Sequence, residues 1–346
     1  MATQRIIAPE AADAPDEQAN WSLRPQRLDE FVGQPDLIER IRITIEAVRQ
    51  RGEPMEHVLL DGPPGLGKTT MAHVIAAEMG ARAHVTSGPA LTRPSDLVGA
   101  LTRLGANDVL FIDEIHRLPA AVEEFIYPAM EDFRIDVAVD SGMHSRTISL
   151  TLKPFTLIGA TTRSGLLSAP LRSRFGVSHH LKYYSASDLQ LILERSARLL
   201  EIPMRDASAL ESVSQRSRGT PRIANRLLRR VRDYAQVRAD GRIATDVVDQ
   251  ALALEGVDAL GLDELDRAYL RTIATTYRGG PVGLEAVAAT MGEDAGTLED
   301  VVEPYLLQIG FLARTRRGRE LTHDGAKHIG VEIEKERRTE LFDSGD

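Results

Sequence analysis

Short apolar runs alternate with longer amphipathic stretches through the first half of the chain. Strands are predicted at 57–61, 82–86, 108–113 and 155–162, of which the last two read as buried. Helices are predicted, from apolar residues spaced three and four apart, at 35–51, 69–79, 95–104 and 119–132. In the first helix the apolar stripe comprises Leu37, Ile38, Ile41, Ile45 and Val48. Strands that alternate with helices predict an α/β fold with a parallel sheet.

The pattern changes after Tyr183 and Tyr184. Four helices come next, the first capped by Ser187, at 187–200, 207–216, 219–238 and 245–254. Further helices are predicted at 263–277, 283–291 and 297–309, the last kinked at Pro304. Two short strands around a basic turn at 310–322 follow, and then a helix capped by Thr322. Helices followed by a two-stranded wing predict a winged helix-turn-helix.

These changes divide the chain into four parts. The first 20 residues are rich in Ala, Asp, Glu, Gln and Pro and are too polar to offset the entropy of ordering them. We therefore predict a disordered tail at 1–20, a large α/β domain at 21–184, a small all-helical domain at 185–255 and a winged-helix domain at 256–346.

Two alternating segments interrupt the large domain at about 133–152. Ile135, Val137 and Val139 share one face of the first segment, and Ile148, Leu150 and Leu152 share one face of the second. With Ser141-Gly142 as the turn, they predict an inserted β-hairpin. Because an isolated hairpin is marginal, its apolar face must be covered, either by its own domain or by another protein.

Composition narrows the function. The chain has no cysteine, so disulfides and thiolate chemistry are excluded, and no apolar run reaches the ~18 residues that span a bilayer. We expect a cytoplasmic protein without membrane contact. A net charge of −9 argues against a protein that coats nucleic acid over its whole surface, so such contact must come from a local basic patch.

A phosphate loop supplies the first chemistry. The segment Asp61-Gly-Pro-Pro-Gly-Leu-Gly-Lys-Thr-Thr70 stands between a predicted strand and a predicted helix. Its glycines let successive N–H groups point at an anion, Lys68 reaches the β- and γ-phosphates, and the Thr69 hydroxyl is placed for Mg²⁺. A strand–turn–helix with glycines for tight packing is the plainer alternative.

The carboxyl ends of the other strands carry polar groups. One strand ends in Asp113 and Glu114 and another in Thr161 and Thr162, so all four reach the crevice of a doubly wound sheet. Asp113 is predicted to hold the metal ion, and Glu114 to orient or deprotonate a water. The alternative is a pair of solvated acids.

Arginines occur at further informative places. The segment 171–176 reads as a loop with Arg172 and Arg174, which are either solvated or paired with phosphate. Arg222 lies at a helix N-terminus, where a nearby anion would explain a positive charge. In the wing, Arg314, Arg316, Arg317 and Arg319 indicate contact with a nucleic-acid backbone, the alternative being a solvated turn.

Taken together, these motifs resemble the AAA+ ATPases and, among them, the RuvB family of bacterial Holliday-junction branch-migration motors. The resemblance covers about residues 21–335 and includes Asp-Glu-Ile-His-Arg-Leu, Gly-Ala-Thr-Thr-Arg, Ser-Arg-Phe-Gly and Arg-Gly-Thr-Pro-Arg-Ile-Ala-Asn-Arg. It implies an α/β fold: an AAA+ parallel-sheet P-loop ATPase domain, a small all-helical lid domain and a C-terminal winged-helix domain.

The resemblance also implies an activity and partners. A homohexameric ring would surround duplex arms of Holliday junctions and use ATP and Mg²⁺ to drive branch migration in recombination and repair. RuvA would dock on the hairpin through Ile148 and Leu150, with the RuvC resolvase in the same complex.

Site roles follow from the same resemblance. Lys68, Asp113 and Glu114 are catalytic, Thr162 is the first sensor, Arg222 the second, and Arg174 the finger that reaches a neighbour's ATP. The implied nucleotide contacts are Leu23, Arg24, Gly65, Lys68, Thr69, Thr70, Glu131, Asp132, Phe133, Arg174, Tyr184 and Arg222. Thr69 and Asp113 would hold the metal, and Arg314 and Arg319 would contact DNA. Many relatives carry arginine where this chain has Ala295, so a DNA contact there is not carried over.

Two other functions fit part of the pattern. A different DNA-linked AAA+ machine, such as a clamp loader or replication initiator, would not account for the hairpin. A non-enzymatic nucleotide switch that regulates transcription would not need the complete hydrolytic set of Glu114, Thr162, Arg174 and Arg222.

Overall fold

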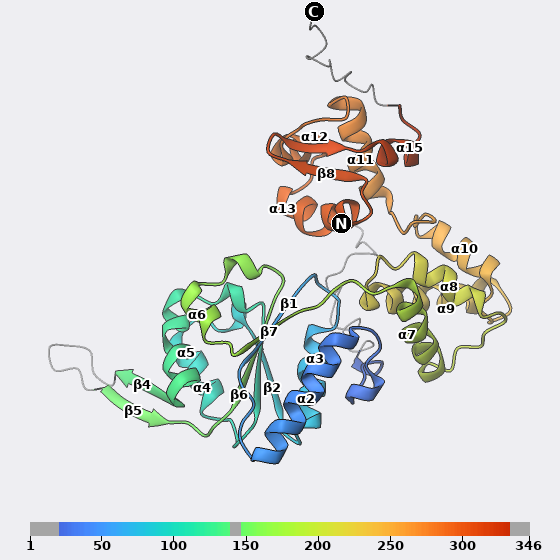
Figure 1. Cartoon of the computed structure of the whole chain (residues 1–346). Helices are drawn as coiled ribbons and strands as arrows, with labels where there is room; N and C mark the ends of the chain where they lie inside the picture. Colours follow the sequence, from blue (N-terminus) through green and yellow to red (C-terminus); the bar gives the residue numbers. More distant parts are fainter. Residues whose placement is uncertain (1–20, 139–146, 333–346) are drawn as a thin grey trace, which may run out of the picture.

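A computed structural model describes residues 21–138 and 147–332. The predicted tail at 1–20, the Ser141-Gly142 turn and the last residues of the chain lie outside this described part. Figure 1 shows an α/β part that carries the sheet, an all-helical part beside it and a third part that contains β8.

The sheet is parallel and five-stranded, in the order β2-β3-β6-β1-β7. Its strands are β1 (Val58–Asp61), β2 (Ala83–Ser87), β3 (Val109–Asp113), β6 (Thr156–Thr161) and β7 (Val177–His180). Successive residues of a strand point to opposite faces, so Leu60 and Leu59 enter different cores. The three inner strands, β1, β3 and β6, are buried on both faces, which explains why they read as continuous apolar runs, whereas the edge strands β2 and β7 are partly exposed.

Helices cover both faces of this sheet (Figure 1). They are α2 (Pro35–Arg51), α3 (Lys68–Glu78), α4 (Pro94–Leu101), α5 (Ala120–Asp132) and α6 (Ala169–Ser173). The predicted stripe of α2 is buried, from Leu37 to Val48, and packs in one core with α3. The other core contains residues of α4 and α5, among them Leu97 and Ile126.

The segment 171–176 is not simply the loop that the sequence suggested. Arg172 lies in α6, whose N-cap Ser168 accepts a hydrogen bond from the Leu171 N–H. Pro170 falls in the first turn, where a proline favours a helix. Arg174 is the C-cap residue, so its backbone is held by the end of a helix.

The predicted hairpin is present as β4 (Arg134–Ala138) and β5 (Thr147–Thr151), which pair antiparallel with Ile135 opposite Leu150. It projects away from the sheet in Figure 1. Ile135 and Leu152 are buried in the core of the large domain, whereas Ile148 and Leu150 are 49% and 38% exposed. The domain therefore covers the base of the hairpin and leaves its outer apolar residues open.

The small domain consists of α7 (Ala186–Leu199), α8 (Ser208–Gln215), α9 (Pro221–Arg238) and α10 (Thr245–Leu254). The predicted cap Ser187 is wrong: Ser185 is the N-cap, and its Oγ accepts a hydrogen bond from the Asp188 N–H at 3.1 Å. The chain turns immediately after Tyr184, so the N-cap lies two residues earlier than predicted.

The C-terminal part is a winged helix. Its helices are α11 (Glu264–Thr276), α12 (Leu284–Met291), α13 (Ala295–Thr297), α14 (Glu303–Gln308) and α15 (His323–His328), and its wing is β8 (Leu312–Thr315) and β9 (Gly318–Leu321). Thr322 caps α15 as predicted.

The predicted single helix at 297–309 is interrupted. A π-helical turn, Leu298–Val302, separates α13 from α14. Pro304 cannot donate to the carbonyl four residues before it, and its ring crowds that carbonyl, so the backbone widens ahead of the proline. No described helix is long and apolar enough to cross a bilayer.

Candidate active site

The phosphate loop joins β1 to α3. Gly62, Gly65 and Gly67 have φ angles of 137°, 78° and 100°, which residues with a side chain adopt only with strain. These turns bring the chain directly into the first turn of α3, which begins at Lys68. Backbone N–H groups and the positive end of the helix therefore face the same space, an arrangement that binds anions.

Lys68 is buried at the floor of this loop. Its Nζ donates hydrogen bonds to the carbonyl oxygens of Gly62 at 2.7 Å and Pro63 at 2.8 Å. Burial lowers the pKa of Lys68 to about 8; the Asp113 carboxylate works against this shift and the Arg222 guanidinium adds to it. A phosphate in the loop would favour the charged form again.

Asp113 and Glu114 stand at the end of β3, on the same cleft as Lys68 and Thr69. The Asp113 Oδ1 accepts the Glu114 N–H at 2.9 Å, and Glu114 has the left-handed φ of 48°. The Glu114 Oε2 is 2.9 Å from Arg117 Nη1. Strained backbone at such a position is typical of functional sites.

The donor set of this cleft fits Mg²⁺. Mg²⁺ is bound by one or two protein oxygens, substrate phosphates and waters rather than by a full protein cage. The Thr69 hydroxyl and the Asp113 carboxylate both line the cleft. Within residues 21–138 and 147–332, no cluster of three or more His, Cys, Asp or Glu side chains could hold a metal ion.

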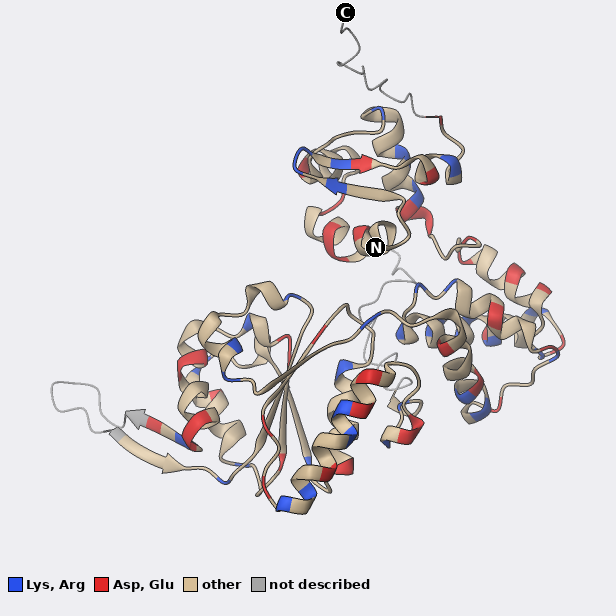
Figure 2. Cartoon of the chain, viewed as in Figure 1, with Lys and Arg blue, Asp and Glu red and all other residues tan. Residues whose placement is uncertain are grey.

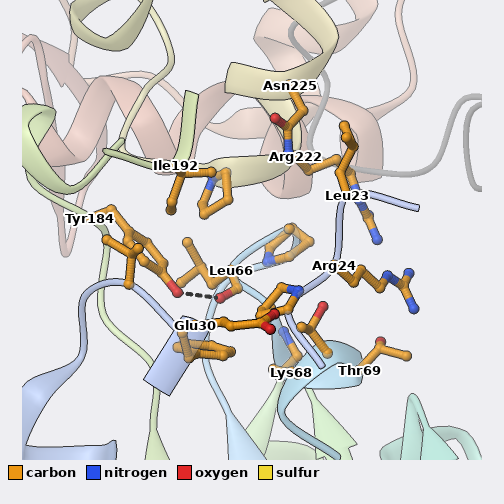
Figure 3. Close-up of a pocket in the computed structure, with 18 of the residues that line it drawn as sticks. Leu23, Arg24, Glu30, Leu66, Lys68, Thr69, Tyr184, Ile192, Arg222 and Asn225 are labelled. Atoms are coloured by element: carbon orange, nitrogen blue, oxygen red, sulfur yellow. Dashed lines mark hydrogen bonds between the residues drawn. The ribbon is translucent and has the colours of Figure 1, made fainter. Parts of the chain in front are cut away.

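The cleft has a volume of about 350 Å³ and lies between the phosphate loop and the small domain (Figure 3). Leu23, Phe31, Tyr184 and Ile192 provide apolar walls away from Lys68. The Tyr184 hydroxyl donates to the Leu66 carbonyl at 3.2 Å, the dashed line in Figure 3. One end thus suits phosphates and the other a flat apolar base.

Most of the predicted nucleotide contacts converge here. Those that line the cleft are Leu23, Arg24, Gly65, Lys68, Thr69, Thr70, Tyr184 and Arg222, and the predicted catalytic residues Asp113, Glu114 and Thr162 line it as well. Thr162 is exposed at the end of β6, whereas its neighbour Thr161 is buried and lies 2.9 Å from His116 Nδ1 through its Oγ1.

Several cleft residues were not foreseen. Asn225 lies one helical turn after Arg222, so the i, i+3 spacing on α9 could have indicated it. Arg195 of α7 donates to the Leu23 carbonyl at 2.6 Å and pairs with Glu30 at 3.0 Å. These bonds hold the N-terminal segment against the small domain, a contact without a local signal in the sequence.

Another group of predicted residues does not line this cleft. Arg174 pairs with Glu131 at 3.2 Å, donates to the Pro170 carbonyl at 2.8 Å, and lies 4.2 Å above the Tyr127 ring. Glu131 and Asp132 end α5, and Phe133 packs against Phe155. Arg174, Glu131, Asp132 and Phe133 therefore form a second location in the subunit.

The wing arginines fall into two kinds. Arg319 Nε donates to the fully buried Glu303 at 2.8 Å, and Arg314 also pairs with Glu303. Arg316 and Arg317 are exposed at the turn. Figure 2 shows basic positions on the wing strands. Two arginines are thus tied into the domain while two point their charge outward.

Family comparisons agree along most of the chain. A model described as the Holliday junction DNA helicase RuvB P-loop domain matches residues 23–181, the RuvB AAA lid domain matches 184–258, and the RuvB C-terminal winged helix domain matches 259–330. The chain belongs to the RuvB family. This assignment replaces the clamp-loader and transcription-switch alternatives.

Individual relatives support the RuvB assignment. A Holliday junction branch migration complex subunit RuvB from Myxococcus xanthus is 57% identical over 302 residues, 87% of this chain and 88% of that protein. The subunit of the same name from Kosmotoga olearia is 53% identical over 328 residues, 95% of each chain.

The structure leads to the same family. The RuvB Holliday junction branch migration motor of Thermotoga maritima superposes with a TM-score of 0.81 at 52% identity, covering 90% of this chain and all of that one. The P-loop AAA+ domain, the lid and the winged helix of this RuvB family member are therefore the fold predicted from sequence.

Proposed function

We propose that this chain is an ATP-driven DNA translocase that drives branch migration of Holliday junctions. One observation carries the proposal: Lys68, Asp113, Glu114, Thr162 and Arg222 converge in one cleft, on a chain that also bears a winged-helix domain. A binding switch needs only the loop, whereas hydrolysis needs a group that acts on water.

The chemistry follows from where these groups stand. ATP lies with its phosphates on the loop and its base against Tyr184 and Ile192. Thr69 and Asp113 would hold Mg²⁺, which would supply neutralising charge for the phosphates. Glu114 orients and deprotonates the attacking water, and Thr162 and Arg222 contact the γ-phosphate from the sheet and the lid.

The finger and the ring belong to a finer proposal. Arg174, which lies outside its own subunit's cleft, completes the ATP site of a neighbour in a homohexamer. Glu131, Asp132 and Phe133 accompany it to that neighbouring nucleotide. Glu131 holds the guanidinium of Arg174 until a more highly charged phosphate competes for it.

Partners fit the remaining exposed surfaces. RuvA docks on the outer hairpin residues Ile148 and Leu150, whose exposure on a projecting strand supports this role. Duplex arms lie against the wing, including Arg314 and Arg319, and RuvC joins the same complex. We expect the machine to work in the cytoplasm.

The decisive experiment is a junction assay. The full chain, RuvA and a labelled four-way junction are mixed with Mg²⁺ and ATP, and conversion to duplex products is followed on native gels. A three-armed substrate that cannot migrate and a reaction with ADP serve as controls. ATP-dependent dissociation of the junction alone is expected; equal product with ADP would refute the proposal.

A further inference from the structure

Arg218 belongs to the small domain, but its side chain is buried against residues of the winged-helix domain. It is only 4% exposed and has the left-handed φ of 53° just before Gly219. Its Nε donates to the Gly261 carbonyl at 2.7 Å, and its Nη2 pairs with Asp266. Its guanidinium also lies 4.8 Å above the ring of Tyr305.

The receiving side of this contact is equally buried. Asp266 is fully buried in the first turn of α11, where its Oδ2 also accepts the Asp263 N–H at 2.9 Å. A buried carboxylate that loses its cation is costly, so the pair strongly favours one arrangement of the two domains.

The two backbones also touch beside this pair. A Cβ on Gly261, which has φ of +80°, would be 2.4 Å from the Arg216 carbonyl oxygen. Only glycine permits this approach. The loop that ends α8 and the segment that precedes α11 are therefore packed directly on each other.

Arg218 is also close to the nucleotide cleft along the chain. Its carbonyl accepts the Thr220 hydroxyl at 3.2 Å, and α9 begins at the next residue, Pro221. The Gly219 carbonyl accepts the Tyr184 N–H at 2.9 Å. Tyr184 and Arg222 both line the cleft. A shift of α9 caused by nucleotide must therefore move Arg218.

The winged-helix domain meets the large domain more weakly. Arg163, next to Thr162, pairs with Asp300, but their side chains are 44% and 47% exposed. Beside them Pro63 and Pro304 line a cavity of only about 30 Å³. An exposed ion pair contributes only ~0–1 kcal/mol, so this contact can break and re-form.

We propose that Arg218 is a positioning residue that joins the lid and the winged-helix domain into one lever, which turns as a unit when the nucleotide in the cleft changes. The inference rests on the proposed function, because the lever is what converts hydrolysis into movement of DNA. The Arg163–Asp300 contact breaks and re-forms as the lever turns.

The functional test compares Arg218→Ala with Arg216→Ala. Arg216 pairs with Asp249 inside the lid at 2.7 Å, and the Asp249 side chain is 53% exposed. Removing the Arg216 side chain therefore breaks a partly exposed ion pair two residues from Arg218, while the Arg218–Asp266 pair and the backbone contact with Gly261 stay in place. Arg218→Ala is expected to hydrolyse ATP at a near-normal rate but to migrate about tenfold fewer base pairs per ATP. Arg216→Ala should migrate normally. Normal coupling in Arg218→Ala would overturn the proposal.

A second measurement needs no motor activity. The chain has no cysteine, so Val237→Cys in the lid and Thr276→Cys in α11, both exposed, can carry a dye pair. Energy transfer in the full chain is expected to be the same with ADP and with a non-hydrolysable ATP analogue. The Arg218→Ala and Asp266→Asn variants should both broaden the distribution of energy-transfer efficiencies. Asp266→Asn supplies the result if Arg218→Ala does not fold.

The two measurements separate the possible failures. If the unmodified protein does not migrate junctions while energy transfer stays fixed, the proposed function is wrong and the lever stands. The lever itself is refuted if the distance between the two dyes changes with nucleotide in the unmodified protein. It is also refuted if the distribution of that distance stays narrow in the folded variants.

Discussion

Replacing Arg319 with alanine tests whether the wing is held together by the arginines that were predicted to contact DNA. Glu303 is fully buried and accepts hydrogen bonds from Arg319 Nε at 2.8 Å and Nη2 at 3.3 Å. Tyr269 and Arg314 also bond to it. Burial alone would raise the pKa of Glu303, but these bonds, from Arg319 above all, hold the pKa below its ordinary value.

The expected loss can be sized from these contacts. Removing one partner of a buried ion pair costs about 3–5 kcal/mol, because the other charge is left uncompensated. Arg314 remains beside Glu303 in the variant, so the lower end applies. Arg319→Ala should therefore destabilise the winged-helix domain by about 3 kcal/mol, which is roughly a hundredfold in its opening equilibrium.

Hydrogen exchange followed by mass spectrometry on the full chain measures this locally. Peptides from α14 and β9 should exchange roughly a hundredfold faster in Arg319→Ala, while peptides of the large domain stay unchanged. Arg317→Ala is the matched control, because this exposed arginine should change stability by no more than ~0.5 kcal/mol. Equal exchange in the two variants would refute the argument.

The effect of acid pH provides an independent check that folding lowers the pKa of Glu303. A carboxylate whose pKa is lowered by folding stabilises the fold above its unfolded pKa, and this stabilisation is lost as pH falls through the lower folded pKa. The protection of the α14 peptides, measured as the intrinsic exchange rate at each pH divided by the observed rate, should therefore fall at acid pH in the unmodified chain. The Glu303→Gln variant should lack that pH-dependent loss of protection; a parallel loss in both proteins would contradict it.

Further predictions concern the motor. At pH 9, ATP binding should take up protons, because Lys68 has a pKa of about 8 and bound phosphate raises it; calorimetric heats that are equal in two buffers of different ionisation enthalpy would contradict this. Glu114→Gln should bind ATP normally but hydrolyse it ~10²-fold or more slowly in a phosphate-release assay, since the amide cannot act as a base. Ile148→Asp should abolish RuvA binding in a pull-down with an unchanged circular dichroism spectrum, whereas Ser149→Asp should bind; unfolding would instead show that the hairpin packs on its own domain. Arg174→Ala subunits mixed with Lys68→Ala subunits should regain part of the hydrolysis that each lacks, and co-assembled but inactive mixtures would exclude action on a neighbour.

Much of the fold could be predicted because its signals are local. Helix 245–254 was predicted from its apolar spacing and is observed as α10 with the same bounds. The phosphate loop, the acids after β3 and the threonines after β6 were placed together because parallel strands end on one edge. All of these arguments use neighbours in sequence or the topology of a parallel sheet.

The remainder depends on contacts between distant residues. Glu303 reads as one more helix-surface acid, and nothing near it announces that Arg319 and Tyr269 will surround it. The partner of Arg174 inside its own subunit, Glu131, is also distant along the chain. Pro304 predicts a disturbed helix, but the proline alone does not say how the backbone relieves its clash with the carbonyl four residues before it. The π-helical turn Leu298–Val302 therefore could not be predicted from the sequence.

The two contacts of the winged-helix domain explain how one hydrolysis site could move DNA without loosening the whole molecule. Arg163 follows Thr162, and Arg218 precedes the helix that bears Arg222, so each contact starts within a few residues of a side chain that lines the nucleotide cleft. If both contacts were buried, any turn of the lid against the large domain would have to break a costly buried pair, and the lid could not turn. If both contacts were exposed, the winged-helix domain would move with neither of the other two domains, because exposed ion pairs contribute too little free energy to transmit force. One buried and one exposed contact is the combination that holds the DNA-binding domain on the lid while allowing both to leave the phosphate loop.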